Sequence, residues 1–350
     1  MEIISEIKRF LKTSSWLTPI NLTAERDRFL ASVIANPHFV YPELPTITLN
    51  KYLLKLRTIP PNPRINELNL ILRLLLARGT SAISEISHKL YGCSYPENLI
   101  AQAEIDAHLP GDFNEQDHLT AEEVQVKTQD YLTSLGLTDW QVLVSDLRDF
   151  YVRVKGSSKT ILVSREINWD FCDFDNLLAH EIDGHVLRAV NMSRQTNPLF
   201  QKPLPFYLKT EEGLASFLGD YLSPQTAVLS RKHHALKYLA GHLGQTASFR
   251  DLHTFFMDHG FTSPLAFRRT FRLKRGLEDT SMPGTNGKES MYYQGMLEVK
   301  AYLDQGGSVT KLYAGKVSLA DLDDVPIPEN EIIPDRILHY QPLNTITKPL

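Results

Sequence analysis

The sequence has few of the residues that would place it in a specialised class of protein. Its 350 residues include two cysteines, Cys93 and Cys172, too few for a disulfide framework. Neither cysteine lies in a metal-type spacing, so we expect free thiols in a reducing compartment. The formal net charge of −4 gives no electrostatic support for a nucleic-acid partner.

Long hydrophobic runs are also missing. The longest apolar stretch, Leu68 to Ala77, is interrupted by Asn69 and Arg73 and is too short to span a bilayer. The first residues carry acids where a secretory signal needs bases. We therefore expect a soluble, cytoplasmic protein with neither a membrane nor a nucleic acid as partner.

What is present is ordinary globular composition, with 42% hydrophobic and 22% charged residues. The chain exceeds the length at which a single core stops growing. We expect residues 1–118 to form a helical region that packs on a core of residues 119–324. Pro326, Pro328 and Pro334 predict an extended tail over 325–350.

Three β-rich runs interrupt the helical pattern at residues 142–144, 150–154 and 160–163. They predict a small antiparallel sheet that leads into the next helix, so the expected fold class is α+β and mainly helical. A sheet edge beside a metal-binding helix can hold a substrate backbone by strand addition. A hairpin that merely covers the helix fits the pattern equally well.

The segment from His180 to His185 reads His-Glu-Ile-Asp-Gly-His, and Glu212 follows on a later predicted helix. Histidine and glutamate are suitable zinc donors, and three protein ligands leave a catalytic zinc one open position for water. We therefore predict a zinc site held by His180, His185 and Glu212. The alternative is two ordinary histidines on a helix, one solvated and one hydrogen-bonded.

The histidines are five residues apart rather than four. On a regular α-helix such residues point about 140° apart, so they cannot both face one ion. One π-type turn would return them to the same face, and Gly184 leaves room for that distortion. The helix should bury an apolar face formed by Leu178, Ile182, Val186, Ala189 and Val190.

Acidic residues surround the predicted ligands. Glu181 adjoins the first histidine, where it can act as the general base toward a water that the metal has made acidic. Glu211 and Asp183 can each orient a histidine N–H.

The pattern His180-Glu-x-x-x-His185 followed by Glu211-Glu-Gly-Leu-Ala215 resembles the microtubule-associated tyrosine carboxypeptidases and their bacterial relatives, known by a Q-E-G-L-A motif. The resemblance covers roughly residues 60–320 and includes Ser87-His-Lys-Leu-Tyr-Gly92, Lys274-Arg-Gly-Leu277, Pro283-Gly284 and Lys288-Glu-Ser-Met-Tyr292-x-x-Gly295. It implies a zinc-dependent carboxypeptidase that removes a C-terminal tyrosine or phenylalanine from a peptide or protein. It also implies that His180, His185 and Glu212 bind the metal and that Glu181 is the base.

Three positions depart from the family pattern. Glu211 stands where bacterial relatives often carry glutamine, Asn191-Met192 replaces Asn-Gly, and Lys288-Glu289 replaces Lys-Asp. These changes leave the ligands and the base in place, so they bear on substrate preference.

A carboxypeptidase must also bind the free carboxylate of its substrate. Arg275, which ends a basic run and precedes Gly276, and Lys288 are the candidates, with Arg272 as another. A solvated basic face is the competing interpretation of that run. Tyr292 is the candidate donor to the oxyanion, and Tyr293, His233 and His234 are alternatives.

Two other functions remain open at this point. The same zinc site would serve an aminopeptidase or an endopeptidase. A non-catalytic regulator with a structural or degenerate metal site is the third possibility, although such a site has no use for Glu181.

Overall fold

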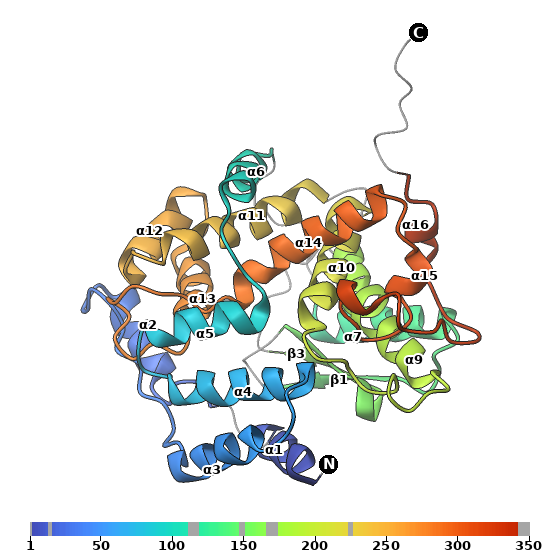
Figure 1. Ribbon diagram of the computed structural model, residues 1–350. Helices are drawn as coiled ribbons and strands as arrows, with labels where there is room; N and C mark the ends of the chain where they lie inside the picture. The colour runs from blue at the N-terminus through green and yellow to red at the C-terminus, as the bar shows by residue number, and fades with distance from the viewer. Residues whose placement is uncertain are drawn as a thin grey trace. The chain divides into compact units, whose positions relative to one another are not determined.

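The computed structural model, shown in Figure 1, describes residues 2–12, 16–110, 119–146, 151–165, 174–222 and 227–341. The chain divides into two compact units, which are Met1–Ala107 with His234–Gln294, and His108–His233 with Gly295–Leu350. Each unit thus combines two segments that are distant in the sequence, whereas the sequence analysis expects three regions that follow one another along the chain. Among the described residues, no helix is both long enough and apolar enough to cross a membrane.

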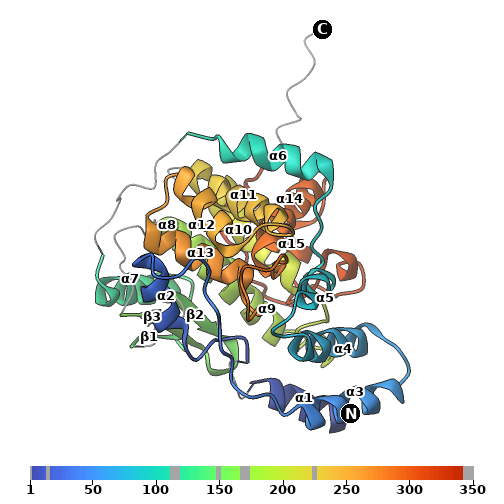
Figure 2. The same cartoon turned by 90° about the vertical axis from the view of Figure 1, so that its left-hand side faces the viewer.

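Unit 1 is built from helices. They are α1 (Glu2–Lys12), α2 (Leu22–Leu30), α3 (Thr46–Arg57), α4 (Pro63–Leu76), α5 (Ala82–Tyr91), α6 (Glu97–Ala107), α12 (Phe249–Asp258) and α13 (Ser263–Lys274), with most of α11 (Ala227–Leu243) and the first part of α14 (Lys288–Asp304). Figure 2 shows α3 next to α1 and α4 at one end of this unit. An aromatic cluster fills part of its core, formed by Phe29, Phe39, Tyr41, Phe249 and Phe267.

Unit 2 contains the small sheet and the predicted metal helix. Its elements are α7 (Ala121–Ser134), β1 (Gln141–Ser145), β2 (Val152–Lys155), η1 (Gly156–Ser158), β3 (Thr160–Ser164), α8 (Phe174–Leu178), η2 (Ala179–Val186), α9 (Leu187–Ser193), α10 (Leu208–Tyr221), the rest of α14, α15 (Val309–Leu312), η3 (Leu319–Asp321) and α16 (Asp335–Leu338). The sequence Thr120-Ala-Glu-Glu123 matches the capping-box pattern, and the structure confirms this cap at the start of α7. Both views show α7 beside the sheet (Figures 1 and 2).

The α+β fold class is confirmed, but the strands pair differently from the expected antiparallel arrangement. The strand order is β1-β3-β2, with β2 antiparallel and β1 parallel to β3. Val142 lies opposite Ile161 in the parallel pair, and Val154 lies opposite the same residue in the antiparallel pair. Because β3 takes the central position, it is buried along most of its length.

The C-terminal residues are not simply extended. The short helix α16 interrupts the predicted tail over 325–350, and its Ile337 is buried. The proline-rich stretch therefore ends in an element that packs on the rest of unit 2.

Candidate metal centre

Three side chains of unit 2 meet where the sequence predicts a metal site. The Nε2 atoms of His180 and His185 lie 3.7 and 3.5 Å from Glu212 Oε2. One donor atom from each of the three residues falls within 4.8 Å of the others. The imidazole rings are nearly perpendicular, at 80° with 5.0 Å between centroids. These residues could therefore hold one metal ion.

A π-helical stretch makes this arrangement possible. Residues Ala179–Val186 form η2, which continues α8 and passes into α9. Its wider turn returns residues five apart to one face, which a regular α-helix cannot do. The predicted π-type turn is thus confirmed. The predicted apolar face is also buried, and its residues are Leu178, Ile182, Val186, Ala189 and Val190.

Gly184 serves this site through packing. A Cβ atom on Gly184 would lie 2.6 Å from Ala215 Cβ and 2.9 Å from Ala215 Cα, on α10. Any larger residue would push η2 away from the helix that carries Glu212. The glycine is therefore required for close approach between two helices.

A second glycine contact positions Glu212 itself. A Cβ on Gly213 would lie 2.4 Å from the carbonyl carbon of Gly295, on α14. A Cβ on Gly295 would lie equally close to the Lys209 carbonyl oxygen, at 2.4 Å. The Glu-Gly-Leu-Ala segment thus combines a candidate ligand with two small residues that let η2 and α14 approach α10.

Glu211 orients His185 from behind. Its Oε1 lies 3.1 Å from His185 Nδ1 and accepts from Lys316, and its Oε2 accepts from Arg188 at 3.1 Å. Burial alone would raise the pKa of Glu211, but Lys316, His185 and Arg188 outweigh it and lower that pKa to about 2. A carboxylate can only accept, so Nδ1 donates and Nε2 is left to face Glu212.

The charges around His185 favour a cation. Burial would lower its pKa, but hydrogen bonds to Glu211 and Glu212 outweigh burial and raise the pKa to about 10. Tetrahedral zinc with bonds near 2.0–2.1 Å needs ligand atoms roughly 3.3 Å apart, which is close to the observed 3.5 and 3.7 Å. The donor set and the two distances to Glu212 are therefore compatible with zinc.

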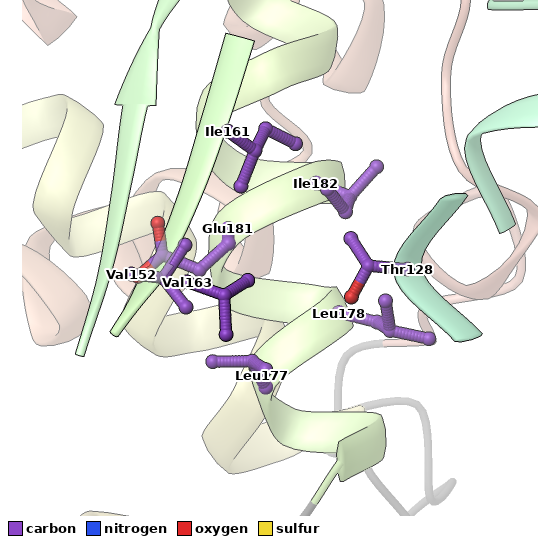
Figure 3. A pocket seen from close by; sticks show the side chains of 8 residues that line it. All are labelled: Thr128, Val152, Ile161, Val163, Leu177, Leu178, Glu181 and Ile182. Carbon is purple, nitrogen blue, oxygen red and sulfur yellow. The ribbon is translucent and has the colours of Figure 1, made fainter. Parts of the chain in front are cut away.

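Glu181 lies beside the candidate ligands and lines a small pocket (Figure 3). The other lining residues are Thr128, Val152, Ile161, Val163, Leu177, Leu178 and Ile182. Glu181 is the one charged residue in that lining. Burial raises the pKa of Glu181, while His180 and His185 oppose the rise. A carboxylate with a raised pKa near a metal is suited to accept and return a proton.

Asp183 does not orient a histidine, contrary to its expected role. Tyr131 of α7 donates to it at 2.8 Å, and Arg336 of α16 pairs with it at 3.0 Å. Among the described residues, neither His180 nor His185 is a partner of this carboxylate. The π-turn that brings residues 180 and 185 together leaves residue 183 facing other elements.

The remaining candidates belong to unit 1, apart from His233, which belongs to unit 2. Tyr292 is partly exposed, stacks on His234 at 5.7 Å between centroids, and has Lys237 Nζ 4.6 Å above its ring. Tyr293 is fully buried and donates its hydroxyl to Asp106 at 2.7 Å, which excludes it as an oxyanion donor.

Arg275 and Lys288 are each half-buried, at the end of α13 and the start of α14. Helix α13 ends at Lys274, and Gly276 just beyond it has φ +105°, a left-handed conformation that suits glycine. The basic run before it is not a solvated face, because Lys274 is fully buried. Arg272 is engaged with Glu289 at 2.7 Å.

Sequence reasoning missed the cations behind the site. Arg188 is fully buried, and Lys316 and Arg336 come from segments far along the chain. Arg188 could have indicated them, because it lies within the apolar run Leu187 to Val190 and a buried arginine needs a partner.

Fold and site together define a class, namely an α+β protein with a candidate mononuclear metal site built on a π-helix. The family model for microtubule-associated tyrosine carboxypeptidase matches residues 62–329. The chain therefore belongs to that family.

Curated relatives support the assignment. Microtubule-associated tyrosine carboxypeptidase 1 of Homo sapiens is 26% identical over 334 residues, which cover 93% of this chain, and the rat protein of that name is 27% identical over the same length. The human putative tyrosine carboxypeptidase MATCAP2 is 30% identical over 172 residues, or 46% of this chain. The chain spans 63% of the length of the human carboxypeptidase 1 and 64% of the rat protein.

Proposed function

We propose that this protein is a zinc-dependent carboxypeptidase that removes a C-terminal tyrosine or phenylalanine from a peptide or protein. One observation carries the proposal: the π-turn in η2 brings His180 and His185 to Glu212, with Glu181 alongside. The family assignment supports the reaction class, and the names of the relatives support an aromatic residue as the leaving group.

His180, His185 and Glu212 would hold the zinc. When bound there, zinc would act as a Lewis acid and make a water molecule acidic near neutral pH. Glu181 takes the proton of the attacking water and passes it to the leaving amine, a role that its raised pKa suits. Glu211 keeps the His185 ring in the orientation that leaves Nε2 available.

Three further residues complete the proposal for substrate binding. We assign Tyr292 as a donor to the oxyanion, and Arg275 and Lys288 as partners of the substrate carboxylate. The assignments rest on the types of these side chains, their partial exposure and their positions in the family-like segments.

For the compartment we propose the cytoplasm, because Cys93 is a buried free thiol. Cys172 lies outside the described residues.

Release of free tyrosine or phenylalanine from short peptides, with and without added zinc, tests the function. A matched peptide with an amidated C-terminus separates the alternatives, because a carboxypeptidase stops cutting it and an endopeptidase does not. A peptide blocked at its N-terminus should still be cut, which an aminopeptidase cannot do.

Glu181→Gln should retain zinc and lose turnover by several orders of magnitude, because the amide cannot take a proton. Elemental analysis checks that the variant retains zinc, and mass spectrometry of the released product checks that turnover is lost. A zinc-loaded variant that turns over at the wild-type rate contradicts the assignment of Glu181 as base. A protein that binds zinc through four protein ligands and releases no product would be the non-catalytic regulator.

A further inference from the structure

The C-terminal segment, residues 313–341, supplies cations to two buried acids near His185. Lys316 Nζ pairs with Glu211, and Arg336 Nε lies 3.0 Å from Asp183 Oδ2. Both acids are almost completely buried, with 2% of Glu211 and none of Asp183 exposed. The two cations therefore neutralise charges that the interior would otherwise not tolerate.

Backbone contacts hold the same segment against the metal-binding helices. Arg188 donates to the Val317 carbonyl at 2.8 Å, and Leu319 N donates to Thr210 Oγ1 at 2.9 Å. Asn191 exchanges two hydrogen bonds of 2.9 Å with the backbone of Ile332. The segment is thus fixed to α9 and α10 at residues that lie between Lys316 and Arg336 in the chain.

We propose that Arg336 and Lys316 are positioning residues for the metal site. Asp183 lies within the π-turn, between the two histidines in the chain, and its carboxylate is held by Arg336 and Tyr131. Anchoring this residue fixes the rotation of the turn that presents His185. Lys316 fixes Glu211, which in turn holds His185 Nδ1.

The inference rests on the proposed zinc site and adds residues that act through others. Partners that orient a metal ligand typically change metal affinity about tenfold to a hundredfold when removed. Arg336 also follows the residues matched by the family model, which end at 329, so the family motifs do not predict it.

Zinc affinity of the full-length protein, measured by competition with a chromophoric chelator, tests the proposal without relying on activity. We expect Arg336→Met to bind zinc about tenfold or more weakly and Arg336→Lys to recover most of the loss. The visible absorption spectrum of the cobalt-substituted protein should change in Arg336→Met, because the ligand geometry relaxes. Lys316→Met should behave in the same way.

Tyr340→Phe is the matched control. Tyr340 lies in the same segment and donates to Asp304 at 2.6 Å, but Asp304 belongs to α14 and not to η2. The control should bind zinc within about twofold of the wild type. Wild-type affinity and spectrum in both Arg336→Met and Lys316→Met overturn the inference, and equal weakening in Tyr340→Phe overturns it as well.

Two further outcomes are informative. Should Arg336→Met fail to fold, Tyr131→Phe removes the other partner of Asp183 without changing any charge and should still weaken zinc binding severalfold; unchanged binding there counts against the proposal. Wild-type protein that binds no zinc overturns the proposed function together with this inference, which distinguishes that failure from a failure of the inference alone.

Discussion

At the scale of single residues, burial decides what each charged group can do. Lys274 is fully buried and donates to the carbonyls of Ala247 and Met282, at 2.5 and 2.8 Å. Sequence alone placed it in a basic run, where a solvated lysine is the common outcome. Burial instead lowers the pKa of Lys274 from 10.5 to about 8, with Asp251 opposing the shift.

This lowered pKa predicts a rise in stability with pH. Between pH 8 and 10.5 the unfolded chain keeps a proton on Lys274 that the folded chain has released, so the free energy of unfolding increases across that window. Below pH 8 the lysine is charged in both states and the cost of burying it is fully present. The expected gain for wild type relative to Lys274→Met is about 3 kcal/mol at the upper end.

Urea unfolding at several pH values from 7.5 upward, on the order of one pH unit apart, measures this difference. Lys89→Met is a suitable control, because Lys89 is exposed in its pair with Glu85. If the free energy of unfolding changes with pH equally in wild type and Lys274→Met, folding does not lower the pKa of Lys274.

At the scale of elements, the site depends on how closely two helices approach. The π-helix η2 carries two candidate ligands, α10 carries the third, and Gly184 faces Ala215 where the helices meet. Helix α10 is buried continuously from Thr210 to Asp220, so it has little freedom to shift. A small change in the contact between Gly184 and Ala215 therefore changes the distance from Glu212 to the two histidines.

Gly184→Ala should destabilise the protein by about 1–3 kcal/mol, because the added methyl group overpacks the contact. It should also weaken zinc binding by separating Glu212 from the histidines. Thermal unfolding and the chelator competition assay give the two values. Adding Ala215→Gly removes the nearest methyl group and should restore part of both losses; a double variant as impaired as Gly184→Ala would contradict the packing explanation.

At the scale of the whole molecule, local patterns were predictable and distant pairings were not. The sequence predicted the three candidate ligands, the π-type turn and the helix cap at Thr120, because each depends on nearby residues or on chemistry. The parallel pairing of β1 with β3 was missed, since a short run of β-branched residues does not specify its partner. The contacts of Lys316 and Arg336 were missed because they join residues more than a hundred positions apart.

The family resemblance supplied what local patterns could not, namely a reaction and a leaving group. The structure adds the physical reasons for the motif residues of unit 2: Gly213 and Gly295 let α10 and α14 approach, and Ala215 accommodates Gly184. The charge of Glu211 in this motif is balanced by Arg188 and Lys316.

The central claim is that a π-turn makes His180 and His185 ligands of one zinc ion together with Glu212. A crystal structure of the zinc-loaded protein, with the metal located by its anomalous signal, tests it most directly. The prediction is one ion with Nε2 of both histidines and a Glu212 oxygen at about 2.0–2.2 Å, and no fourth protein ligand. An ion bound without His185, or an undistorted α-helix between the two histidines, would contradict the claim.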